Sequence, residues 1–147
     1  MPIARINQPE ARGRPGGVTA LAIFFAAGAV VCVVSTTALL FPGSVLEPMW
    51  RLNPRGHAAF VSMGPWAPVL LSVVGVGCAA AAHGLRSGRS WGRRLAIALI
   101  TINLIGDAAN VVSGTEPRAV IGIPITALLL LYLATGRVRA YFAGVTK

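Results

Sequence analysis

The chain has 147 residues, of which 55% are hydrophobic and 12% charged, and its mean hydropathy is +0.72. This composition excludes an ordinary water-soluble domain and fits a single membrane domain. The net charge of +9 does not indicate nucleic-acid binding, because the basic residues fall between long uncharged apolar runs. Their placement indicates membrane topology instead.

A basic stretch rich in proline and glycine, residues 1–16, opens the chain and predicts a disordered tail. The apolar run that follows, 17–41, is longer than the hydrophobic region of a cleavable signal peptide, so we expect it to be a retained first span. Three further apolar runs lie at 66–83, 95–112 and 119–134. Crossing a hydrocarbon layer of about 30 Å takes roughly 20 residues of helix. The sequence therefore predicts an all-α fold, a four-helix transmembrane bundle over 17–147.

Lysine and arginine are unevenly distributed between the connections. Ten of the thirteen fall in the N-terminal tail, between the second and third runs, and after the fourth run. The other side of the predicted bundle holds only Arg51, Arg55 and Arg118. By the positive-inside rule we expect a multi-pass protein of a bacterial inner membrane with both termini in the cytoplasm.

The first outer connection, 42–65, is long enough to contain helices of its own. Ser44 and Glu47 have the spacing of a capping box, and Asn53 precedes a proline that suits the first turn of a helix. We expect two short interfacial helices, at 45–52 and 54–63. They would lie on the outer surface as a lid.

Small residues and one proline mark the second and fourth spans. The second span carries a face of glycine and alanine, which favours close packing of neighbouring helices in lipid. Pro124, next but one to Gly122, is expected to bend the fourth span or to make its first turns irregular.

The third span contains the one acidic residue found within the four runs. Asn103, Asp107 and Asn110 fall within about 60° of one another on a helix. Asp107 lies roughly 20 Å into a layer of about 30 Å, so it should face the bundle and find a partner there. The expected partners are all on the outer side, namely Arg118, Arg51, Arg55 and His57. We prefer a structural tie that holds the loop on the bundle, and a ligand, ion or proton site is the alternative.

Chemistry-bearing residues are otherwise sparse. Cys32 and Cys78 stand singly in apolar runs, and His57 and His83 are predicted on opposite sides of the membrane, so neither pair indicates a redox or metal centre. Recognised catalytic and phosphate-binding motifs do not occur. We predict no catalytic residues, no metal site and no cofactor. The arginine-rich connection at 86–94 would attract anionic lipid headgroups, although topology alone explains it.

Several short motifs resemble those of a loose class of small bacterial four-span membrane proteins of unknown function. They are Phe-Pro-Gly at 41–43, Leu-x-x-x-Trp-x-Leu-Asn-Pro at 46–54, Gly-Pro-Trp-Ala at 64–67, Asn-x-x-Gly-Asp-x-x-Asn at 103–110, Ile-Gly-Ile-Pro at 121–124 and Val-Arg-Ala-Tyr-Phe at 138–142. The resemblance begins at about residue 41 and implies no activity. Vitamin K epoxide reductase-like proteins have a similar number of spans, but their paired cysteines are missing here.

Three functional hypotheses follow from these features. The preferred one is an accessory or scaffold subunit without catalytic activity, whose partners are the lipid bilayer and a larger membrane complex or further copies of itself. The alternative is a small transporter or channel-like oligomer that uses the polar face around Asp107. The least favoured is a membrane enzyme with Asp107 and His57 as acid and base.

Overall fold

A computed structural model describes residues 13–114 and 119–144. Within these ranges the chain is helical and contains no strand, which confirms the all-α class. The elements in chain order are α1 (Gly16–Leu40), the 3-10 helix η1 (Glu47–Leu52), α2 (Pro54–Ser62), α3 (Trp66–Arg86), α4 (Ser90–Val112), α5 (Ala119–Ala134) and α6 (Gly136–Gly144).

Several helices are compatible with a membrane protein. By length and composition, α1, α3 and α4 can each cross a membrane. A fourth crossing results if α5 and α6 are counted as one span, bent by 53° at the break between them. At 1.5 Å per residue the 16 residues of α5 reach only about 24 Å, less than the hydrocarbon thickness. Within residues 13–114 and 119–144, three or four helical segments are therefore long and apolar enough to cross a membrane.

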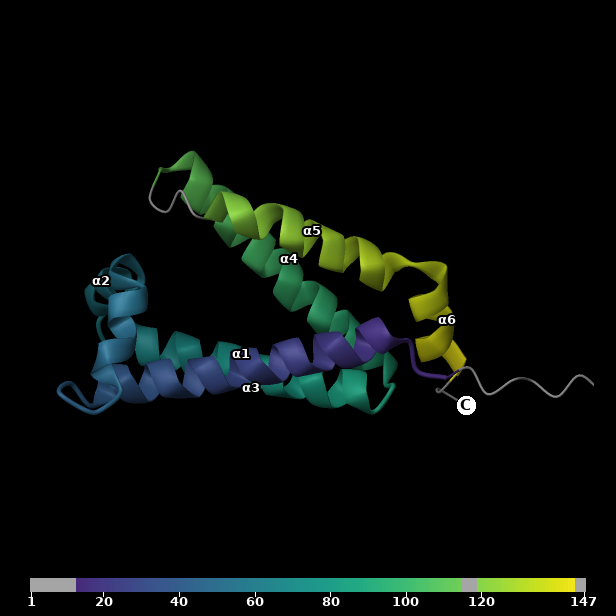
Figure 1. The fold of residues 1–147 in the computed structure, drawn as a ribbon, viewed down its shortest axis with the longest axis horizontal. Helices are drawn as coiled ribbons and strands as arrows, with labels where there is room; N and C mark the ends of the chain where they lie inside the picture. The colour runs from purple at the N-terminus through teal and green to yellow at the C-terminus, as the bar shows by residue number, and fades with distance from the viewer. Residues whose placement is uncertain (1–12, 115–118, 145–147) are drawn as a thin grey trace, which may run out of the picture.

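The helices at the arginine-rich connection are longer than the apolar runs that predict them. α3 continues to Arg86 and α4 begins at Ser90, so the connection between these two helices is only residues 87–89. Arginine lowers the hydropathy of a segment but is a good helix former. A hydropathy pattern therefore underestimates the length of a helix that extends beyond the apolar core of a membrane. The end of α3 and the start of α4 lie close to α6 (Figure 1). We call this the arginine-rich end of the molecule.

The sequence patterns do not predict the helix α6. They predict a fourth span that ends near residue 134 and no helix after it. The chain bends by 53° between α5 and α6, and α6 packs against α4 and α5 (Figure 1). Val138 and Phe142, one helical turn apart, are its buried residues. This apolar pair gives the otherwise polar segment one face to bury, which is why it folds as a separate helix.

Two helix pairs form the body of the molecule. α1 and α3 lie side by side along most of their length, whereas α4 and α5 form a second pair that diverges from the first (Figure 1). The two pairs meet at the arginine-rich end and separate toward the opposite end, where η1 and α2 lie. We call that opposite end the loop end.

The hydrophobic core lies near the arginine-rich end. Its buried members are Val18, Leu21, Ala22, Phe25, Ala81, Leu85, Ala96, Ile100, Leu133, Val138 and Phe142. Polar contacts hold the same end together: the Arg14 guanidinium donates to the Arg86 carbonyl and, over 3.4 Å, to the Tyr141 hydroxyl. The long helices share one core in this half of the molecule, not along their whole length.

The loop end differs in part from its prediction. Asn53 caps α2 as expected, because its side-chain oxygen accepts from the Gly56 N–H at 2.9 Å. The predicted capping box is wrong: Glu47 accepts from the Gly43 N–H at 2.6 Å, and the buried Ser44 hydroxyl has no partner within the described part of the chain. The first short helix is a 3-10 helix that begins at Glu47, two residues later than predicted. Both elements lie across the end of the α1/α3 pair (Figure 1).

Candidate functional site

The polar face of α4 contains one hydrogen-bonded pair of side chains. The Asn103 amide donates to the Asp107 carboxylate at 3.0 Å, across one helical turn. Asp107 is half-buried, while Asn103 and Asn110 are exposed. An i,i+4 amide–carboxylate bond fixes the orientation of both side chains. The helix therefore presents an ordered polar pair about two-thirds of the way along its length.

Asp107 also reaches the neighbouring helix α5, where it lies directly against Gly122. A Cβ atom built on Gly122 would be 2.5 Å from Oδ2 of Asp107 and 3.2 Å from its Cγ. Any larger residue at this position would displace the carboxylate. Gly122 thus makes room for Asp107, a role that the sequence does not reveal because it depends on the register between α4 and α5.

The fourth predicted span passes through its proline without a break. α5 remains helical at Pro124, and a bend of 53° separates it from α6 after Ala134. Next to the proline, the buried hydroxyl of Thr126 donates to the carbonyls of Gly122 and Ile123, at 2.9 and 3.0 Å. Bonding back into its own helix satisfies this hydroxyl inside an apolar environment.

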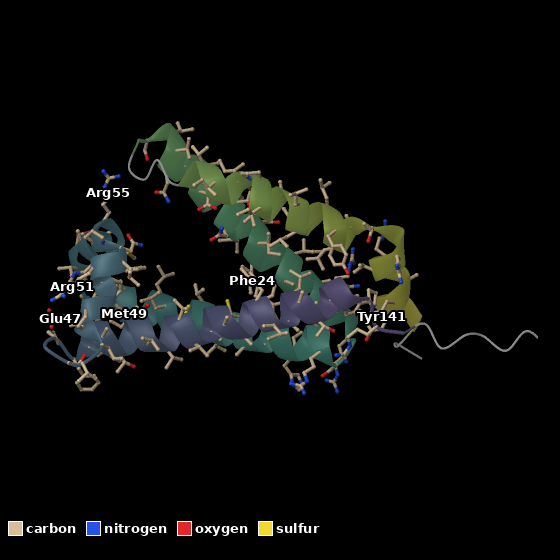
Figure 2. The ribbon with its side chains drawn as sticks, in the orientation of Figure 1. Phe24, Glu47, Met49, Arg51, Arg55 and Tyr141 are labelled. Carbon is tan, nitrogen blue, oxygen red and sulfur yellow. The ribbon has the colours of Figure 1, made fainter. Side chains whose placement is uncertain are left out.

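A cavity of about 380 Å³ lies where the two helix pairs begin to separate. All four long helices line it: Phe24, Phe25, Gly28, Val31 and Cys32 from α1, Val74 and Cys78 from α3, Leu99, Ile100, Ile102 and Asn103 from α4, and Thr126 and Leu129 from α5. Figure 2 shows Phe24 on the side of α1 that faces the second pair. We call this space the interpair cavity. Its lining is mostly apolar, and at one edge it contains Asn103, whose hydrogen-bond partner Asp107 lies outside the lining.

The other residues predicted to join Asp107 lie elsewhere or are not described. His57 stacks on Trp50, with ring centroids 4.8 Å apart, and lines a separate pocket of about 430 Å³ at the loop end. Arg51 lines that same pocket, and Arg55 projects from α2 away from the α1/α3 pair (Figure 2). Arg118 lies outside the described residues. The structure brings together Asn103 and Asp107 but not His57 and Asp107, so an acid–base pair of these two residues has no geometric support.

The remaining candidate ligands are dispersed. Within residues 13–114 and 119–144, no three His, Cys, Asp or Glu side chains lie close enough together to hold a metal ion. Cys32 and Cys78 are free thiols on the wall of the interpair cavity. His83 lies 3.5 Å from the Ser87 hydroxyl at the end of α3.

The chemistry available at the interpair cavity is recognition by shape and hydrogen bonding. A polar side chain exposed to hydrocarbon carries a desolvation cost unless it is paired, so Asn103 and Asp107 favour an incoming group that donates a hydrogen bond. The apolar walls favour an incoming apolar surface by van der Waals contact. The site is thus suited to an apolar partner with one polar group.

No protein-family model matches the chain, and neither a curated protein nor a solved structure matches it.

Proposed function

We propose that this chain is a non-catalytic accessory or scaffold subunit of a larger membrane complex, and that it binds a transmembrane helix of its partner between the two helix pairs. It would cross the bilayer four times, with α5 and α6 together as the bent fourth span. The distribution of Lys and Arg supports a cytoplasmic location for both termini. The resemblance to small bacterial four-span proteins supports the bacterial inner membrane.

The observation that carries the proposal is the interpair cavity with its polar edge. Phe24 and Ile102, on opposite walls, are 56% and 66% exposed although both line the cavity. Exposed apolar residues are ordinary against lipid, but an exposed asparagine beside a half-buried carboxylate is not. A helix seated here would cover both walls and would pair with the Asn103–Asp107 edge.

The energetics suit association between helices better than catalysis. In lipid, helices associate by close packing, and each polar contact between them adds about 0.6 to 2 kcal/mol. The interpair cavity offers several apolar contacts and the Asn103 amide, which is hydrogen-bonded to Asp107 next to the cavity. A partner helix with small residues and one donor, such as a hydroxyl or an amide, fits this combination.

Site-specific photocrosslinking in the native membrane tests the proposal. A benzoylphenylalanine placed at Phe24 or Ile102 should link the full-length chain to one partner protein of defined mass. Ile23 and Leu131 are 65% and 66% exposed and line none of the cavities described, so they serve as matched controls. We expect the same crosslink to be weak or missing from these two positions.

A substitution at the polar edge separates a specific interface from chance proximity. Asn103→Leu keeps the approximate shape of the side chain but removes its hydrogen bonds, so it should abolish the crosslink from Ile102. The free energy of unfolding should stay within about 1 kcal/mol of the original, because an i,i+4 amide–carboxylate pair on a helix contributes only a few tenths of this. Equal crosslinking from cavity and control positions, or crosslinks that persist in Asn103→Leu, would reject the proposal.

The transporter hypothesis remains the second candidate, because Asn103, Asp107 and Asn110 follow one face of α4. It requires these residues to line a pore between copies of the chain. In that case crosslinks from Phe24 and Ile102 would join identical chains, and vesicles containing the purified protein would show ion or solute flux. Asp107→Asn would then abolish the flux while leaving folding nearly intact.

A further inference from the structure

Another cavity, of about 470 Å³, lies at the arginine-rich end between the start of α4 and the helix α6. Ser90, Arg93 and Arg94 line it from α4, and Arg139, Phe142 and Ala143 line it from α6. These segments are distant in the sequence, and the bend between α5 and α6 places α6 against the start of α4 (Figure 1). We call this cavity the arginine pocket.

The charge of the arginine pocket has one sign. Three guanidinium groups line it, and no described acidic side chain does. The first turn of α4 contains no acidic residue, and its N-cap, Arg89, makes no side-chain capping bond. The partial positive charge at the N-terminus of α4 therefore adds to the positive charge of the arginines. Like charges held around one cavity repel one another, and an anion bound between them would relieve that repulsion.

One of the three arginines is fixed in place by the fold. Nε of Arg93 donates to the carbonyl of Leu133 at 3.0 Å, at the end of α5. This bond holds the side chain across the junction between α4, α5 and α6, with Arg94 and Arg139 exposed beside it. A planar guanidinium held in a defined orientation is suited to two hydrogen bonds with a phosphate group.

The pocket also has an apolar side. Phe142 is buried and, with Ala143, forms part of the wall. Trp91, in the first turn of α4, is 40% exposed at the same end of the molecule, and exposed tryptophan favours the headgroup region of a bilayer. A ligand that matches both sides of this pocket carries a negative phosphate next to an apolar group.

We infer that the arginine pocket binds the phosphate group of an anionic phospholipid such as phosphatidylglycerol, at the membrane surface where α4 begins. The inference is independent of the proposed accessory function, since the arginine pocket and the interpair cavity share no lining residue. Inorganic phosphate offers the same chemistry without an acyl chain, and the experiment distinguishes the two sources.

The test measures lipid binding to the full-length chain by native mass spectrometry, titrating phosphatidylglycerol or phosphatidylcholine into detergent micelles. The pocket variant is Arg94→Gln with Arg139→Gln, which leaves the Arg93–Leu133 bond in place. Its matched control is Arg89→Gln with Arg137→Gln, which removes two charges from the same end outside the pocket. With about 1 kcal/mol for each cation, the pocket variant should lose about 30-fold in affinity for phosphatidylglycerol, and the control far less.

A third variant, Ala143→Trp, fills the pocket without changing its charge and should also lose binding. It keeps the inference testable if the double variant fails to fold. Competition with inorganic phosphate identifies the source: a phospholipid site keeps its lipid at phosphate concentrations that saturate a site for the free ion. If both double variants lose affinity equally, or if Ala143→Trp binds as the original chain does, the attraction is a diffuse surface effect and the inference is wrong.

Discussion

Gly84 in α3 is in backbone contact with Gly92 in α4. A Cβ atom on Gly84 would lie 2.5 Å from the Cα of Gly92, and a Cβ atom on Gly92 would lie 2.5 Å from the Cα of Gly84. Both residues are buried. Small residues allow such close approach of helices in lipid, where association depends on packing. This contact joins the two helix pairs at the end where they meet, and the interpair cavity lies on the side toward which they diverge.

Enlarging either glycine should separate the pairs. We expect Gly92→Val to destabilise the protein by about 1 to 3 kcal/mol, because the obstructing atoms belong to backbone and have to move together with α3. Unfolding in detergent, followed by circular dichroism, measures the effect. Gly106→Ala in the same helix is the control, since a Cβ there meets nothing within 4 Å and the change should be neutral or slightly stabilising. A similar loss from both substitutions would show that the Gly84–Gly92 contact has no special importance.

The position of Asp107 against Gly122 predicts coupling between the two residues. Gly122→Ala alone should cost about 1 kcal/mol, because the new methyl group displaces the carboxylate. In a chain that already carries Asp107→Ala, the same substitution should cost nothing, since the space is vacant. A double-mutant cycle on unfolding free energies measures the difference. Additive effects would mean that the carboxylate does not occupy this position in the membrane.

Arg93 should stabilise the junction between α5 and α6. Arg93→Gln removes the charged donor from the Leu133 carbonyl, and a hydrogen bond to a charged group contributes about 1.5 to 3 kcal/mol. Hydrogen exchange in Gly136–Gly144 should rise, because α6 depends on this junction for its position. Arg94→Gln, at an exposed neighbouring residue, should leave both measurements unchanged. Protection of α6 that is the same in the two variants would contradict the role assigned to Arg93.

Asn53 should control the order of α2 alone. Replacing this N-cap with alanine removes the acceptor for the Gly56 N–H and should cost about 1 kcal/mol locally. The expected result is faster hydrogen exchange in Pro54–Ser62 with no change in α1 or α3. Asn53→Asp keeps the acceptor and should behave as the original. Faster exchange spread over α1 and α3 would indicate that the loop end stabilises the whole helix pair.

Local sequence patterns predicted one helix cap at the loop end correctly and the other wrongly. Asn53 caps α2 as its pattern indicates, because an N-cap and its first turn are adjacent residues. Ser44 and Glu47 have an equally good local pattern, but Gly43 adopts a φ of 80° and turns the chain so that its own N–H meets Glu47. A capping box requires the backbone between its members to be helical, and the spacing of the two residues does not ensure this.

The sequence by itself determined the helical class, the approximate bounds of the four long helices and the shared face of Asn103 and Asp107, because these depend on hydropathy and on the period of one helix. Only the tertiary structure decided that Gly122 receives the carboxylate, that α6 packs against α4 and α5, and where the interpair cavity and the arginine pocket lie. Helices such as α1 and α5 are apolar all round. In lipid such a helix has no polar face to indicate its orientation, so its neighbours are chosen by the fit of small and large side chains between helices distant in the sequence.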